Sequence, residues 1–179
     1  MNEKKQRIET RKYTVIPRTL CFLFSENKVL LIRYSGLKGT WAGKYNGIGG
    51  HVDQGESIFR SALREIEEET GLVPDSLQLC GTVMINTASS PGIALYIFAG
   101  GLRMIASEAL LVSPEGEASW ISIEDLKSLP LMEDTPMLIE KSIAVLAGKS
   151  PPFAALYQYT DEGKLDIQMD TPDLVEKSS

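Results

Sequence analysis

The chain has 179 residues, of which 43% are hydrophobic and 23% are charged, and its mean hydropathy of −0.06 is ordinary for one soluble domain. The net charge of −6 and the pI of about 4.9 argue against a broad basic face that would bind nucleic acid polymers. His51 is the single histidine, which excludes a histidine-rich metal site or a histidine relay, so any chemistry has to rest on carboxylates.

Neither a membrane span nor a secretory signal is visible in the sequence. No apolar run is long enough to cross a bilayer, and the N-terminus lacks the apolar segment of a signal peptide. Cys21 and Cys80 form neither a zinc motif nor a disulfide framework, and both are interpreted as thiols of the core. We expect a cytoplasmic protein with one domain over residues 14–170, between flexible tails at residues 1–13 and 171–179.

The folded region opens with a predicted hairpin and a glycine-rich loop. Residues 19–24 and 29–34 are apolar and β-rich, and a polar turn separates them. The following loop, residues 36–50, contains six glycines, so its backbone can adopt conformations that are closed to other residues.

A helix is predicted next, over residues 57–70. Ile58, Ala62 and Ile66 recur there at helical spacing, and Gly71 is the expected C-cap. Further along the chain, strands are expected over residues 77–86, 93–99 and 118–121. Two helices are expected over residues 123–129 and 137–147, and a closing hairpin is expected over residues 153–159 and 165–169.

Three glutamates of the first helix share one face. Glu65, Glu68 and Glu69 stand at positions i, i+3 and i+4, where like charges repel one another. A bound divalent cation would turn this repulsion into attraction, and magnesium is usually held by carboxylates together with substrate phosphates. The alternative is a solvated acidic face, which is the common fate of a charge run.

The residues around these glutamates complete a longer pattern. Nine positions within residues 50–72 match G-x5-E-x7-R-E-U-x-E-E-x-G-U, namely Gly50, Glu56, Arg64, Glu65, Ile66, Glu68, Glu69, Gly71 and Leu72. This pattern resembles the Nudix box in full. The resemblance implies an α/β/α sandwich with a central mixed β-sheet, in which a loop-helix-loop binds one to three divalent cations.

The resemblance also implies roles for the residues of the box. Glu65, Glu68 and Glu69 are expected to bind metal, Glu65 and Glu69 first, and one of the three would orient or deprotonate the attacking water. Arg64 would pair with a glutamate of its own helix and fix its direction. Glu56 is expected to support the loop or to approach the metal through water.

Further metal ligands are expected from outside the helix. In the family a glycine carbonyl ligates metal, which here means Gly49 or Gly50. An additional acidic ligand often precedes a late strand, where Glu115 and Glu117 are both candidates, each with solvation as the alternative. Mg²⁺ is the expected cofactor, and Mn²⁺ is expected to substitute for it.

Segments outside the box resemble the Nudix enzymes that remove oxidised purine nucleotides such as 8-oxo-dGTP. Residues 41–50 resemble the corresponding segment of that group, in which the residue matching Asn46 contacts the base. The sequence departs from the group at His51, where those members commonly carry lysine. Glu133 and Asp134 resemble an acidic stretch that reads the purine edge, and the closing hairpin resembles the group's C-terminal strands. Alternatively, Asn46 supports a glycine turn, and the two acidic residues cap the next helix.

The resemblance implies a magnesium-dependent nucleoside triphosphate pyrophosphohydrolase that acts on a small-molecule nucleotide and yields a monophosphate and pyrophosphate. Hydrolysis of a nucleotide sugar or a dinucleoside polyphosphate is the first alternative, because the box is indifferent to the leaving group. A non-catalytic nucleotide-sensing domain is the second. The sequence leaves the base, the number of metals and the oligomeric state open.

Overall fold

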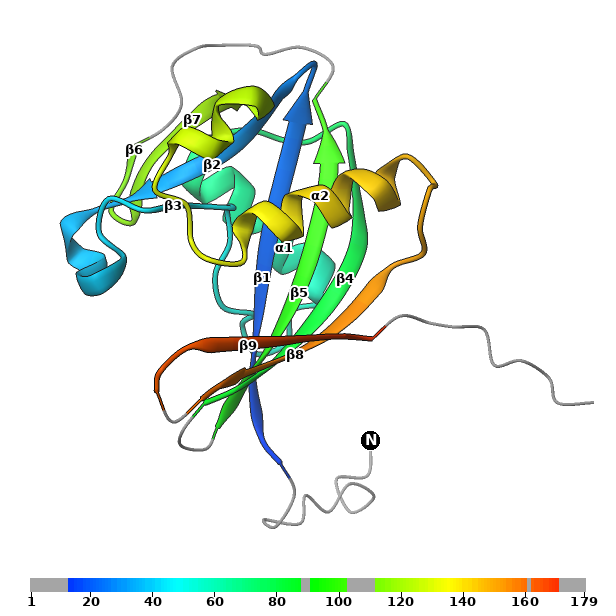
Figure 1. The fold of residues 1–179 in the computed structure, drawn as a ribbon. Coiled ribbons are helices and arrows are strands. Elements are labelled where there is room, and N and C mark those ends of the chain that lie inside the picture. Colours follow the sequence, from blue (N-terminus) through cyan, green and yellow to red (C-terminus); the bar gives the residue numbers. More distant parts are fainter. Residues whose placement is uncertain (1–12, 88–90, 103–111, 161, 171–179) are drawn as a thin grey trace, which may run out of the picture.

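A single mixed sheet runs through the computed structural model, which describes residues 13–87, 91–102, 112–160 and 162–170 (Figure 1). The strands are β1 (Val15–Ser25), β2 (Lys28–Tyr34), β3 (Tyr45–Asn46), β4 (Ser76–Asn86), β5 (Gly92–Gly101), β6 (Val112–Ser113), β7 (Gly116–Ser122), β8 (Phe153–Tyr159) and β9 (Leu165–Asp170). Their order is β6-β7-β2-β1-β5-β4-β8-β9, with β3 paired to β2. Strand β1 pairs in parallel with β5, as does β4 with β8, and the other described pairings are antiparallel.

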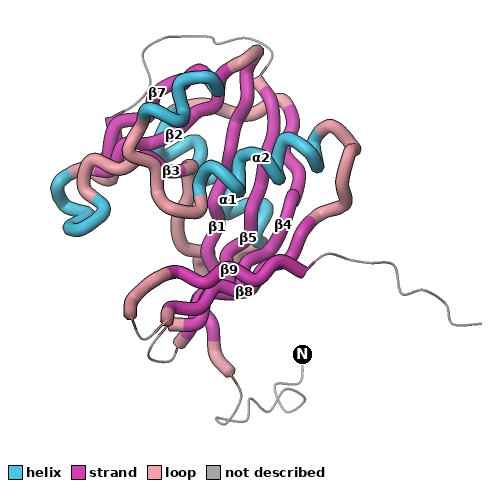
Figure 2. Tube along the Cα trace, viewed as in Figure 1, coloured by secondary structure: helices cyan, strands magenta, loops and turns pink. Residues whose placement is uncertain are grey.

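Helices cover both faces of this sheet. Helix α1 (Ile58–Thr70) packs on one face and α2 (Thr135–Leu146) on the other, as the cyan helices in Figure 2 show. Cys21 lies in the core beneath α1 and Cys80 in the core beneath α2, and both are free and fully buried. The predicted α/β/α sandwich and the assignment of both cysteines to the core are therefore confirmed.

Helix α1 forms where the sequence predicts it because both of its ends are capped. The Ser57 hydroxyl accepts a hydrogen bond from the Arg60 amide at 3.2 Å, and Gly71 ends the helix with a φ of 73°. Ala62 and Ile66 are fully buried against the sheet. The apolar stripe thus fixes which way the helix faces, and Glu65 and Glu69 lie against the neighbouring loop.

Strands β1 and β2 separate beyond their hairpin, and the glycine-rich loop enters between them. Near the hairpin Leu23 pairs with Leu30, but further along β2 the partner of Ile32 is Asn46 of β3. The loop then meets β1, where Cys21 and Ile48 form an isolated bridge. The backbone of the glycine-rich loop is thereby held against the middle of the sheet, directly below α1.

Several elements differ from the prediction. Strand β1 starts at Val15 rather than at residue 19, because its parallel pairing with β5 extends from Phe24 back to Val15. The predicted helix at residues 123–129 is a 3-10 helix, η3 (Ile123–Ser128), which ends at Ser128 because Leu129 precedes Pro130 and a residue before proline disfavours helical backbone. The glycine-rich loop contains another 3-10 helix, η2 (Gly36–Trp41), and strand β3. These two elements and strand β6 are short, and the sequence analysis did not predict them.

Residues 1–12 and 171–179, for which tails are predicted, lie outside the described residues. Within the described ranges, no helix has the length and apolar character needed to cross a membrane.

Candidate active site

Two glycines of the loop lie between β1 and α1 with no room for a side chain. The Gly50 carbonyl accepts a hydrogen bond from the Thr19 amide at 2.9 Å. A Cβ atom at Gly49 would lie 2.1 Å from the Thr19 carbonyl oxygen, and one at Gly50 would lie 2.5 Å from Glu65 Oε1. Glycine at position 50 therefore allows the Glu65 carboxylate to rest directly on the loop backbone.

The carboxylates of Glu65 and Glu69 extend from α1 toward this loop. Glu69 is only 4% exposed and accepts a hydrogen bond from the Gly49 amide at 3.3 Å, while the Glu65 side chain is 13% exposed. Burial, followed by the charge of Glu115, raises the pKa of Glu69 to about 8, and burial also raises the pKa of Glu65. Burial thus disfavours the charged form of both carboxylates, and a cation bound between them would favour it.

Arg64 organises the outer side of the cluster. Its guanidinium makes a two-pronged contact with Glu56, with Nε to Oε1 and Nη2 to Oε2 both at 3.0 Å. Its Nη1 donates to Glu65 Oε1 at 2.8 Å and to Glu68 Oε2 at 3.1 Å. The Nη2 group also donates to the His51 carbonyl at 2.9 Å, which ties α1 to the loop. Hydrogen bonding to Arg64 lowers the pKa of Glu56.

The structure separates the predicted ligands into two groups. Glu65 and Glu69 lie against Gly49 and Gly50, whereas the Glu68 side chain is 59% exposed and turned toward Arg64. In the part of the chain that the structure describes, no three His, Cys, Asp or Glu side chains are close enough to form a metal site as they stand. The donor set nevertheless fits a divalent cation, because buried carboxylates with raised pKa values gain most from a positive charge between them.

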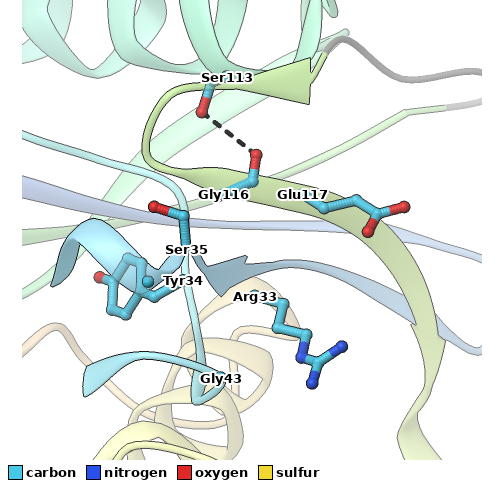
Figure 3. A pocket seen from close by; sticks show the side chains of 8 residues that line it. Arg33, Tyr34, Ser35, Gly43, Ser113, Gly116 and Glu117 are labelled. Atoms are coloured by element: carbon cyan, nitrogen blue, oxygen red, sulfur yellow. Dashed lines mark hydrogen bonds between the residues drawn. The ribbon is translucent and has the colours of Figure 1, made fainter. Parts of the chain in front are cut away.

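Glu115 and Glu117, which the sequence could not separate, have different surroundings. Glu115 lies near Glu69 and adds to the rise in its pKa by charge and by a hydrogen bond. Glu117 is exposed and is the cross-strand partner of Arg33. It lines an open pocket of about 410 Å³ between the end of β2 and the β6–β7 hairpin, where Figure 3 shows it on the same side as Arg33. Glu115 is therefore the candidate that joins the carboxylate cluster.

The residues predicted to contact a base meet on the other side of the loop. Strand β3 runs beside residues 130–132, since the Tyr45 amide donates to the Pro130 carbonyl at 2.9 Å and the Met132 amide donates to the Tyr45 carbonyl at 2.9 Å. Asn46 accepts a hydrogen bond from the Thr135 hydroxyl at 2.9 Å, next to Asp134. Burial raises the pKa of Asp134, whose side chain makes no capping hydrogen bond to α2.

Tyr34 was missed by the sequence analysis. Its hydroxyl accepts a hydrogen bond from Asn46 Nδ2 at 3.3 Å. Burial is the largest cause of a raised pKa of Tyr34, and the charges of Glu69, Glu115 and Asp134 add to the rise. Tyr34 thus lies between the carboxylate cluster and the predicted base contacts, although only its place at the end of a strand before a glycine-rich loop could have indicated this.

In the metal-free protein, we expect stability to fall as the pH rises from about 5 to about 9. Glu69 has a folded pKa of about 8 against an ordinary value of 4.5, so its contribution is fully present below 4.5 and lost as the pH passes through 8. Glu69→Gln carries no charge at either pH. The melting temperature of the variant, measured with a chelator present, should therefore exceed that of the wild type by a growing margin as the pH rises.

Each kcal/mol of this difference should appear as roughly 2–4 °C in the melting temperature. Magnesium should reverse the trend and stabilise the wild type more at the higher pH, because it replaces the proton. A difference in melting temperature between Glu69→Gln and the wild type that stays constant as the pH rises would show that Glu69 is not held in an unfavourable charged state.

Comparison with known proteins identifies the family. The model of the NUDIX domain family matches residues 15–140. The oxidised purine nucleoside triphosphate hydrolase of Mus musculus is 31% identical over 131 residues, which cover 69% of this chain and 79% of that protein. The uncharacterised Nudix hydrolase YvcI of Bacillus subtilis is 30% identical over 115 residues, which cover 63% of this chain and 70% of that protein.

Solved structures share the fold. The MutT protein of Bacillus halodurans superposes with a TM-score of 0.65 at 23% identity, over 87% of this chain and 98% of its own. The NUDIX domain of NrtR from Shewanella oneidensis, solved with ADP ribose, gives 0.66 at 22% identity, over 82% and 99%. From the domain match and the mouse relative it follows that this chain belongs to the Nudix family, hydrolases that act on pyrophosphate bonds of nucleoside diphosphate derivatives.

Proposed function

We propose that this chain is a magnesium-dependent pyrophosphohydrolase that converts a nucleoside triphosphate to the monophosphate and pyrophosphate, with an oxidised purine such as 8-oxo-dGTP as its base. The observation that carries the proposal is the placement of Glu65 and Glu69 against the Gly49–Gly50 backbone, with Glu115 beside Glu69. The base is supported by the activity named for the mouse relative, a hydrolase of oxidised purine nucleoside triphosphates.

Nudix hydrolases generally depend on a divalent metal, and here Glu65 and Glu69 would hold it together with Glu68 or Glu115. Such an ion withdraws charge from phosphate oxygens and makes a bound water more acidic. The chain itself supplies orientation, since the Gly49 amide fixes Glu69 and the Arg64 guanidinium fixes Glu65. A glycine carbonyl, of Gly49 or of Gly50, is a further candidate ligand; that of Gly50 already accepts the hydrogen bond of the Thr19 amide and would bind the ion through its second lone pair.

Recognition of the base is assigned to Asn46, Asp134 and Glu133 beside the start of α2. The Asn46 amide and the Asp134 carboxyl are both half-buried, while Glu133 is exposed. Because burial favours the neutral form of Asp134, this carboxyl is suited to donate as well as accept a hydrogen bond. An amide next to a carboxyl whose pKa is raised matches the mixed donors and acceptors of a purine edge.

A product assay across nucleotides tests the proposal. With magnesium or manganese, 8-oxo-dGTP should give the highest kcat/KM and release pyrophosphate rather than inorganic phosphate. A higher kcat/KM for a nucleotide sugar or a dinucleoside polyphosphate would contradict the assigned substrate. Tight nucleotide binding without any product would instead support the sensing function.

A further inference from the structure

Asn46 is held by hydrogen bonds from three directions. Its Oδ1 accepts from the Thr135 hydroxyl at 2.9 Å and from the Gly47 amide at 2.9 Å. Its Nδ2 donates to the Tyr34 hydroxyl at 3.3 Å. Thr135 is fully buried at the first turn of α2, and Tyr34 is the last residue of β2. Strand β2 and helix α2 therefore each contribute one partner to this side chain, and the neighbouring amide of Gly47 contributes the third.

The partners of Asn46 dictate which way its amide points. A backbone N–H group can only donate, so the atom that faces the Gly47 amide must be the side-chain carbonyl oxygen. The Thr135 hydroxyl takes up the second acceptor position of that oxygen. What Asn46 has left for a ligand is an N–H of its amide, because one of its two N–H groups already points to Tyr34.

We propose that Thr135 and Tyr34 are positioning residues that hold Asn46 so that it presents an N–H donor, and that the site thereby selects a purine with a carbonyl oxygen over one with an amino group at the contacted edge. This inference rests on the proposed function. An amino group facing the fixed N–H would leave two donors opposed and without acceptors, which a buried site penalises.

The first substitution tested is at Thr135, because its hydroxyl is one of the two donors that hold Oδ1 and its removal leaves the Gly47 amide as the remaining donor, so that the amide is held less firmly. In Thr135→Val the shape of the side chain is kept while the donor to Asn46 is lost. Thr135→Ser keeps the donor. Ser142→Ala is the matched control, because it removes another fully buried hydroxyl from the same helix, away from Asn46.

Steady-state hydrolysis of inosine triphosphate and of ATP, which carry a carbonyl and an amino group at the same purine position, tests the inference. In Thr135→Val the KM for inosine triphosphate should rise about three- to tenfold, the loss expected for one hydrogen bond, with kcat changed by less than about twofold. The preference for inosine triphosphate over ATP should fall by a similar factor. Tyr34→Phe should shift the preference in the same direction, and Thr135→Ser should restore it.

A purely structural role for Thr135 would weaken both nucleotides alike, so an unchanged preference in Thr135→Val would overturn the inference. Asn46→Ala separates it from the proposed function. If this variant keeps the wild-type preference while the enzyme hydrolyses both nucleotides, Asn46 does not face the base, and the hydrolase assignment stands without the inference. A wild-type enzyme that hydrolyses neither nucleotide nor 8-oxo-dGTP would overturn the proposed function, and the inference with it.

Discussion

Glu69→Gln is expected to lower kcat by about 10²–10⁴-fold, the range for removing a positioned group that activates water. Glutamine has the same shape as glutamate and can still accept the hydrogen bond from the Gly49 amide, so the loop should stay in place. The substitution removes only the negative charge that would hold a cation. Initial rates at saturating magnesium and nucleotide, together with a thermal melt, provide the measurement.

Glu67→Gln is the matched control for this experiment. Glu67 lies on the same helix, but it is exposed, and its position is not one of the specified positions of the box. It should keep wild-type turnover. If Glu69→Gln also kept near-normal kcat while it remained folded and bound magnesium, the assignment of this carboxylate cluster as the active site would be wrong.

The helix of the site could be predicted from the sequence because its determinants are local. The spacing of Ala62 and Ile66, the capping serine and the glycine at the C-terminus all lie within one short segment. The same spacing predicts that Glu65 and Glu69 share a face. It cannot predict that Glu68 turns outward to Arg64, because that choice depends on the loop that packs against the helix.

The rest of the site depends on contacts between distant segments. Glu115 and Glu117 are separated by one residue, and the turn between β6 and β7 decides which of them approaches Glu69. Thr135 lies 89 residues from Asn46, and no pattern within either segment indicates their hydrogen bond. Residues of this kind become visible only when the register of the sheet and the start of α2 are known.

The short elements of the glycine-rich loop escaped prediction for a related reason. Strand β3 consists of Tyr45 and Asn46 and is defined by its pairing with β2, where Ile32 and Arg33 are its partners. Two residues are too few to show an alternating pattern. The conformation of the loop that holds Asn46 therefore depends on its pairing with β1 and β2, between which its glycines allow it to fit.

Arg64→Lys is expected to lower kcat/KM by about 10- to 100-fold, the usual effect of removing a group that orients metal ligands. Lysine keeps the positive charge, so the overall field of the site is preserved. Its single ammonium group cannot reproduce the two-pronged contact with Glu56 while also donating to Glu65 and Glu68. The Glu65 carboxylate should then lose its fixed direction, and the magnesium concentration needed for half-maximal activity should rise.

Arg60→Lys is the matched control for Arg64→Lys, because Arg60 is an exposed arginine on the same helix. The same change in chemistry at that position should leave kcat/KM and the magnesium requirement unaltered. A result in which both lysine variants behave alike would mean that charge near the helix suffices and that the geometry set by Arg64 is irrelevant. A loss confined to Arg64→Lys would instead mean that the direction of the Glu65 carboxylate limits catalysis, because charge, helix and loop are otherwise the same in the two proteins.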